Sequence, residues 1–333
     1  MNSNNVFYFK NIVDKYYPTE DISVDTQTVV SSVREDIKKL DDDSFSEMMI
    51  SCFIPDLYSG MGKCEKLFTK LTELMVGEWW RRMGGCYNLP TKKSGTEDVE
   101  LILDDCSVVC DAKVFRLGRS QKAPNVKDFL KLASIQMWID NLSKKYKDKK
   151  HKVIGGLITY SSLHEWESDS EVYEECTNIN TPVIMLPYEI LALLLKYKSR
   201  VNIHDFMKIW NYKDNGVTKN RSKALYWAYV SRFICNLLGI SLNAFVSEIN
   251  SYHKMILSSI GLYKKIIQDS IDDTNSLILV EVQNYNDVQS LQDYVVNAIS
   301  KRDNAQALDY LKHINQFRSY KDDKDDKDDK DDK

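Results

Sequence analysis

The sequence contains no run of twenty apolar residues, and glycine and proline are scarce, with 12 and 6 positions among 333. The missing apolar run excludes an ordinary membrane-spanning helix. The opening MNSNNVFYFK also lacks the basic and then apolar layout of a secretory signal. Few helix-breaking residues and 43% apolar content favour a largely helical chain with a real core and no membrane partner.

The seven cysteines form no recognisable pattern. They contain no C-x-x-C pair, and none of the five histidines stands at zinc-ligand spacing from them. An odd and scattered set defines neither a disulfide framework nor a zinc site. We interpret these residues as reduced core thiols and expect a cytoplasmic protein.

Charge is low overall but unevenly placed. The formal net charge is −4, of which the tail KDDKDDKDDKDDK (321–333) carries −3. Residues 113–152 hold twelve Lys or Arg against three Asp. A strongly basic stretch in a nearly neutral body favours a local anionic partner, although a solvated helix face with a basic loop would look the same.

Periodicity and turn residues predict the elements. Residues 63–83 place Leu67, Leu71, Leu74 and Met75 at helical spacing, and Gly84-Gly85 ends that helix. DVELIL (98–103), SVVCDAKVF (107–115), KVIGGLITY (152–160) and TPVIMLP (181–187) are typical of strands. Helices are predicted over most of 1–60, over about 126–147, and from 188 to about 318 with a loop at 213–220.

These elements predict an α/β fold, with a mixed sheet flanked by helices and extensive helical elaboration at both ends. No linker is evident, so we expect a single domain over 1–320, with a core at about 63–200 and a helical C-terminal part at about 200–318. The tail 321–333 cannot bury apolar surface and is predicted to be disordered. Its repeat is of the kind left by an epitope tag or a repeat expansion.

Asp104-Asp105 predict a tight turn between the first two strands, because Asp tolerates the positive φ that such turns need. Leu103 would then pair with Cys106, and Asp98 would lie opposite Asp111 with Cβ atoms roughly 4.5–5.5 Å apart. Like charges facing each other destabilise a hairpin unless a divalent cation lies between them. Lys113 would lie on the same face as Asp111, while Ala112 points into the core.

Two carboxylates with a neighbouring ammonium suit phosphodiester hydrolysis. Mg²⁺ on the carboxylates polarises a phosphoryl oxygen and activates water, and a lysine offsets the charge that builds on the phosphate. The competing interpretation is an edge hairpin whose polar side faces solvent. A shift of one residue in register would also separate the two carboxylates.

The order Asp98…Asp111-Ala112-Lys113 resembles the PD-(D/E)xK nuclease motif, with Glu97 in place of the proline. The run CDAKVFRLGRSQKAPNVKDF (110–129) resembles the HindIII-type restriction endonucleases more specifically. EKLFTK (65–70), TPVIMLPYEILALLL (181–195) and FMKIWN (206–211) follow the same family in the same order. The resemblance covers about residues 63–240.

This resemblance implies a PD-(D/E)xK restriction-endonuclease-like core and a Mg²⁺-dependent type II enzyme. The enzyme would be a homodimer that cuts both strands of double-stranded DNA at a short palindrome, with AAGCTT as the first site to try. A cognate DNA methyltransferase would act on the same site. Asp98 and Asp111, with the backbone carbonyl of Ala112, would bind the metal, Lys113 would be the catalytic lysine, and Glu65 would be an additional acid carried by a helix.

The basic loop after the second strand supplies the expected DNA contacts. Asn125 is a candidate base reader, because an Asn side chain can bond both edge atoms of adenine. The other contacts would be Arg116, Arg119, Lys122 and Lys127. Two rival functions remain at this point: a repair or junction-resolving nuclease of the same fold, and a non-catalytic DNA-binding or scaffold protein.

Overall fold

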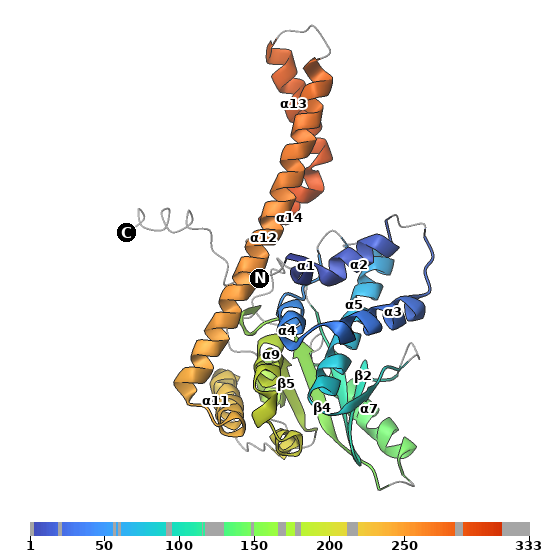
Figure 1. The fold of residues 1–333 in the computed structure, drawn as a ribbon, viewed down its shortest axis with the longest axis vertical. Coiled ribbons are helices and arrows are strands. Elements are labelled where there is room, and N and C mark those ends of the chain that lie inside the picture. The colour runs from blue at the N-terminus through green and yellow to red at the C-terminus, as the bar shows by residue number, and fades with distance from the viewer. Residues whose placement is uncertain are drawn as a thin grey trace.

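A five-stranded sheet wrapped by helices forms the body of the protein, and one very long helix extends from it in this computed structural model (Figure 1). The structure describes residues 3–18, 22–55, 58, 61–90, 95–114, 116, 130–147, 150–165, 171–176, 181–211, 219–283 and 289–314. The tail 321–333 lies outside these residues.

Five α-helices precede the sheet among the described residues, and the fifth is the predicted helix at 63–83. Leu67, Leu71, Leu74 and Met75 on this helix are buried, which confirms the amphipathic pattern. The helix ends before Gly84, which has a φ of 105°. Glycine adopts this conformation readily, whereas a residue with a side chain would be strained in it. The five helices are α1 (Ser3–Val6), α2 (Tyr8–Tyr16), α3 (Thr26–Lys39), α4 (Asp42–Ile50) and α5 (Gly62–Arg82).

The strands follow the chain in the order β1-β2-β3-β4-β5. The first two pairs are antiparallel and the last two are parallel, so the sheet is mixed as predicted. The parallel step from β3 to β4 is bridged by helix α7 (Leu132–Lys145), which begins later than the predicted residue 126. The strands are β1 (Cys86–Asn88), β2 (Val99–Leu103), β3 (Cys106–Ala112), β4 (Lys152–Tyr160) and β5 (Val183–Pro187).

Two glycines in β4 let neighbouring elements approach its backbone. A Cβ on Gly155 would lie 2.5 Å from the carbonyl oxygen of Pro182, and a Cβ on Gly156 would lie 2.6 Å from Ile135 of α7. Trp210 also packs against Gly155 and donates its indole N–H to the Gly156 carbonyl at 2.8 Å. The GG pair inside an otherwise β-branched strand therefore marks close packing.

The outer edge of the sheet at β5 is covered by C-terminal elements. Tyr226 of α11 (Lys219–Leu238) is fully buried, and its hydroxyl bonds both the N–H and the carbonyl of Met185 at 2.7 Å. These bonds occupy backbone groups that an edge strand would otherwise expose. The shorter elements in this region are η2 (Leu163–Glu165), α8 (Glu171–Cys176), α9 (Tyr188–Lys196), η3 (Lys198–Arg200), α10 (Ile203–Phe206) and η4 (Met207–Asn211).

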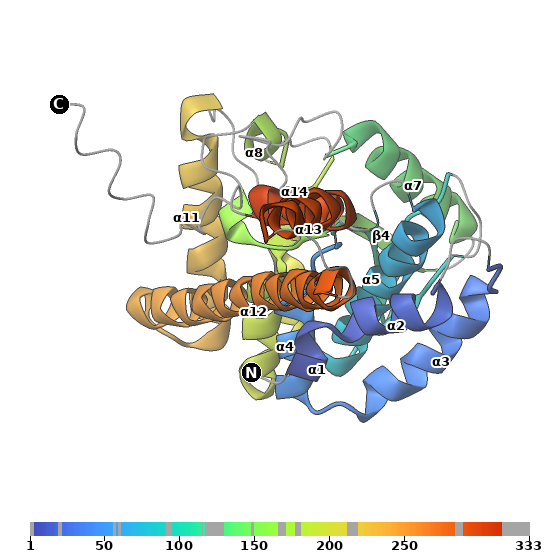
Figure 2. The ribbon, with the colours of Figure 1, turned by 90° about the horizontal axis from the view of Figure 1, so that it is seen from above.

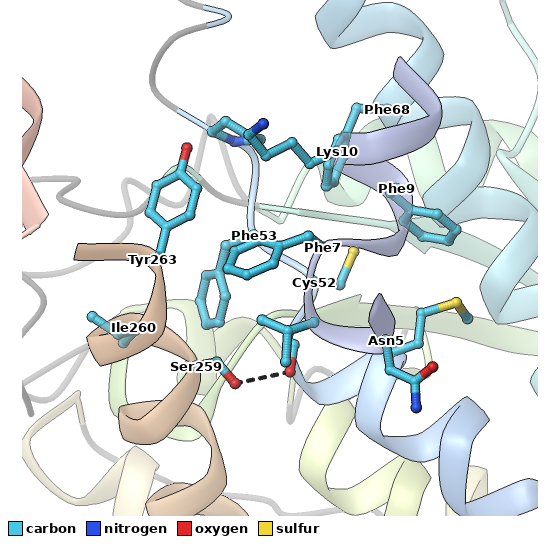
Figure 3. A pocket seen from close by; sticks show the side chains of 14 residues that line it. Asn5, Phe7, Phe9, Lys10, Cys52, Phe53, Phe68, Ser259, Ile260 and Tyr263 are labelled. Carbon is cyan, nitrogen blue, oxygen red and sulfur yellow. Dashed lines mark hydrogen bonds between the residues drawn. The ribbon is translucent and has the colours of Figure 1, made fainter. Parts of the chain in front are cut away.

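Helix α12 (Leu242–Gln283) has 42 residues and extends beyond the body of the protein. Helices α13 (Gln289–Asp303) and α14 (Ala305–Ile314) lie beside its second half (Figures 1 and 2). Its first half packs against α4, α9 and α11. A small apolar cavity separates α12 from the N-terminal helices (Figure 3). Across it, the hydroxyls of Ser51 and Ser259 share a hydrogen bond of 3.0 Å.

The seven cysteines are all free, which agrees with the prediction of reduced thiols. Five are buried, but Cys86 is exposed and Cys106 is partly exposed, so the prediction of a core position is wrong for these two. Among the described helices, none is by itself long and apolar enough to cross a membrane.

Candidate active site

The β2–β3 hairpin has the predicted register. Leu103 pairs with Cys106, and the ladder continues through five pairs to Val99 and Cys110. Asp104 in the turn has φ 48°, a conformation that Asp tolerates better than most residues. This register brings Asp98, just before β2, to the end of β3 that carries Asp111.

Asp98 and Asp111 are neighbours in a site that is largely screened from water. The Asp111 residue is 7% exposed, and the Asp98 carboxylate accepts a hydrogen bond from the Ala112 N–H at 3.1 Å. Burial, and then the charges of Asp111 and Glu73, raise the pKa of Asp98 well above its ordinary value, against the opposing effect of the Ala112 bond. A proton or a cation is therefore needed to hold this pair together.

Glu73 of α5 is a third acid at this place, and the sequence interpretation missed it. It is 3% exposed; burial and then the charge of Asp111 raise its pKa, while Lys70 at 2.6 Å lowers it. Burial, and then the charges of Asp98, Asp111 and Glu73, likewise raise the pKa of the Cys110 thiol, so the three acids act on the same part of β3. A glutamate on the buried side of an amphipathic helix was the available signal.

Lys113 lies where the spacing predicted. Its ammonium is 2.8 Å from the Asp111 carboxylate, and its side chain is 16% exposed. β3 lies between β2 and β4, and all but its first residue are buried. The alternative of an edge hairpin with a solvated polar face is therefore excluded, because these charges lie against the packed centre of the sheet.

The fold places Glu65 and Arg116 in contact with each other. The Arg116 guanidinium forms an ion pair with the Glu65 carboxylate, and the backbone of Arg116 forms a β-bridge with Ile54. Glu65 lies eight residues before Glu73 on α5, which corresponds to about 12 Å along the helix axis. Glu65, the predicted additional acid, and Arg116, a predicted DNA contact, therefore form one ion pair just beyond the end of β3.

The remaining predicted DNA contacts lie outside the described residues. These are Arg119, Lys122, Asn125 and Lys127. Their roles stay predictions.

The donor set fits a hard divalent cation. Asp98 and Asp111 offer carboxylate oxygens and Ala112 a backbone carbonyl, and Mg²⁺ is usually held by one or two carboxylates with water and phosphate oxygens completing the octahedron. Among the residues that the structure describes, no group of three His, Cys, Asp or Glu side chains is placed so that it could hold a metal ion.

A mixed sheet flanked by helices, with paired carboxylates and a lysine at the end of a central strand, defines a restriction-endonuclease-like α/β fold. The sequence profile of the HindIII restriction endonuclease family matches residues 11–258. The chain belongs to this family, and it is a type II restriction endonuclease, a phosphodiester hydrolase that binds DNA.

The match is wider than the motifs indicated, because it also includes the N-terminal helices from residue 11. It ends within α12, so the second half of α12, α13 and α14 lie beyond it. No curated protein sequence matches the chain.

Proposed function

We propose that this restriction endonuclease hydrolyses both strands of a short palindromic DNA site in a Mg²⁺-dependent reaction at Asp98, Asp111 and Lys113. The observation that carries the proposal is the pair of buried Asp111 and partly buried Asp98, with Lys113 at 2.8 Å from Asp111. Restriction endonucleases of this family generally use a divalent metal ion, and the paired carboxylates are the natural place for it.

Each group of the site has a part in the chemistry. Asp98, Asp111 and the Ala112 carbonyl would hold the cation, which would supply polarisation of a phosphoryl oxygen and a lower pKa for water. Lys113 lies beside the phosphate and offsets the charge that develops there. Glu73 supplies further negative charge for the cation from α5, a role for which Glu65 is the alternative.

The proposal includes a homodimer, because two active sites related by a two-fold axis match the symmetry of a palindrome. AAGCTT is the first sequence to test, and Asn125 is the proposed base reader. Arg116, Arg119, Lys122 and Lys127 are the proposed backbone contacts, and a DNA methyltransferase that protects the same site is the proposed companion enzyme. Cytoplasmic location belongs to the same proposal.

The test is digestion of a plasmid of known sequence that contains AAGCTT, with Mg²⁺ or with EDTA. Wild type, Lys113→Ala and the control Lys39→Ala, an exposed lysine of α3, are compared. Discrete Mg²⁺-dependent fragments, lost only in Lys113→Ala, are expected, and mapping their ends identifies the site. Uniform degradation would favour a repair-type nuclease, and intact plasmid in every lane would favour a binding protein; either result contradicts the proposal.

A further inference from the structure

Both backbone polar groups of Lys113 are held by neighbouring segments. Lys113 is the first residue after β3, and its N–H donates to the Thr159 carbonyl of β4 at 2.9 Å. Its carbonyl accepts a hydrogen bond of 2.6 Å from the hydroxyl of Tyr188, the first residue of α9. Tyr188 is fully buried, and the bond is only partly shielded from water because Lys113 remains slightly exposed.

We propose that Tyr188 is a positioning residue, whose hydroxyl fixes the backbone from which the Lys113 ammonium reaches the scissile phosphate. The inference rests on the proposed function, in which Lys113 is the catalytic lysine. A lysine ammonium sits on a flexible four-carbon stem, so its placement depends on the point where the stem is anchored. β3 ends at Ala112, and Tyr188 extends the anchoring by one residue beyond the strand.

The hydroxyl of Tyr188 distinguishes a positioning role from simple packing of its ring. Phenylalanine would fill almost the same space, and burying a hydroxyl costs free energy unless the hydroxyl makes a hydrogen bond. Tyr188→Phe removes one buried donor and leaves the ring in place. Because small displacements of a catalytic group reduce rates strongly, the effect is expected on kcat and not on DNA binding.

Tyr226 provides a matched control. It is also fully buried, and its hydroxyl bonds both backbone groups of Met185 at 2.7 Å. Met185 lies on β5, two strands from β3 and away from the proposed catalytic groups. Tyr226→Phe therefore removes at least as much hydrogen bonding, but at a strand that carries no catalytic group.

The experiment measures Mg²⁺-dependent cleavage, kcat, KM and Tm for wild type, Tyr188→Phe, Tyr226→Phe and Lys113→Ala, on a DNA substrate that wild type cuts. We expect Tyr188→Phe to lower kcat about tenfold with KM unchanged. We expect Tyr226→Phe to lower Tm at least as far while kcat stays within about twofold of wild type. Lys113→Ala is expected to be inactive.

The outcomes separate the positioning role of Tyr188 from the proposed function on which it rests. Wild-type kcat in Tyr188→Phe, with Lys113→Ala inactive, would overturn the positioning role and leave the proposed function intact. Equal losses of kcat in both tyrosine variants would also overturn it, because the hydroxyls would then act only through stability. Wild-type cleavage by Lys113→Ala would overturn the proposed function itself, and the positioning role with it.

A second substitution covers the case in which Tyr188→Phe does not fold. 3-Fluorotyrosine at position 188 keeps the ring and the hydroxyl but makes the hydroxyl a stronger donor. We expect 3-fluorotyrosine at position 188 to change kcat. We expect 3-fluorotyrosine at position 226 to leave kcat unchanged. Unchanged kcat at both positions would contradict the positioning role.

Discussion

The charges of Asp111 and Glu73 act on the Asp98 carboxylate near the end of β3, and two lysines pair with Asp111 and Glu73. Lys113 pairs with Asp111 at 2.8 Å and Lys70 with Glu73 at 2.6 Å. Three carboxylates against two ammonium groups leave a formal charge of −1, which a divalent cation would reverse to +1. Pairing with the two lysines offsets part of the cost of holding these carboxylates in a partly buried site.

Glu73 and Glu65 can be separated by a pair of isosteric variants. Because Glu73 acts on the pKa of Asp98 whereas Glu65 pairs with Arg116, we expect Glu73→Gln to lower the Mg²⁺-dependent cleavage rate about tenfold, or about 1.4 kcal/mol of barrier. Glu65→Gln is expected to change the rate less. Single-turnover cleavage rates measure both, and the reverse order would return the role to Glu65.

Glu189 should make stability depend on pH. It is fully buried at the start of α9, where Ser162 donates to it at 2.6 Å and the Leu163 N–H at 3.3 Å. Burial raises the pKa of Glu189 to about 7 against an ordinary value of 4.5. The folded protein therefore binds more protons than the unfolded chain in this window, and stability falls as pH rises from 4.5 to 7.

The variant Glu189→Gln removes this titration and keeps the acceptor for Ser162. Relative to wild type, its free energy of unfolding should rise by about 3 kcal/mol across that window and stay level above it. Urea denaturation of both proteins from pH 4.5 to pH 8 measures the difference. Parallel curves would show that Glu189 has the same pKa in the folded and unfolded states.

At the scale of elements, the hairpin was predictable and its surroundings were not. The Asp104-Asp105 turn fixes a local register, which is why Asp98, Asp111 and Lys113 could be placed from the sequence. β1 was missed because three residues, Cys86, Tyr87 and Asn88, carry no periodicity and form a strand only by pairing with β2. Glu73 and Tyr188 were missed because helix-to-sheet packing brings them to β3 across long stretches of chain.

Close packing of β4 gives a stability prediction. Gly155→Ala would place a Cβ 2.5 Å from the Pro182 carbonyl oxygen, a backbone atom that cannot move aside cheaply. We expect a loss of about 1–3 kcal/mol and a lower Tm in thermal denaturation. Gly62→Ala, at the start of α5 with no neighbouring atom within 4 Å of the new Cβ, is the control and should leave Tm unchanged or raise it. Equal effects of the two changes would argue against the packing described for β4.

At the scale of the whole molecule, the family match covers only part of the folded chain. The sheet and helices α3 to α11 lie within residues 11–258, whereas α12 continues to Gln283 and is followed by α13 and α14. Periodicity predicted this helical end but not its shape, because a long helix that leaves the body looks the same in sequence as one that folds back (Figure 1). The elements that position the proposed catalytic groups are all inside the matched part.

The dimer proposal predicts a mass. Light scattering of the purified protein should give twice the chain mass of 38.7 kDa, because a palindrome is read by two copies related by a two-fold axis. DNA carrying one palindrome should bind one such dimer. A chain that remains at 38.7 kDa with and without that DNA would contradict the homodimer.

Asp98, Asp111 and Lys113 are proposed to perform the chemistry. A comparison of DNA binding with DNA cleavage tests this most directly. Asp111→Asn and Lys113→Ala are compared with wild type for DNA affinity in Ca²⁺ and for cleavage of the same DNA in Mg²⁺. We predict that both variants bind with affinity within about tenfold of wild type and cleave at least about 10³-fold more slowly. Cleavage near the wild-type rate in either variant, with its ends at the same positions, would place the chemistry elsewhere in the molecule.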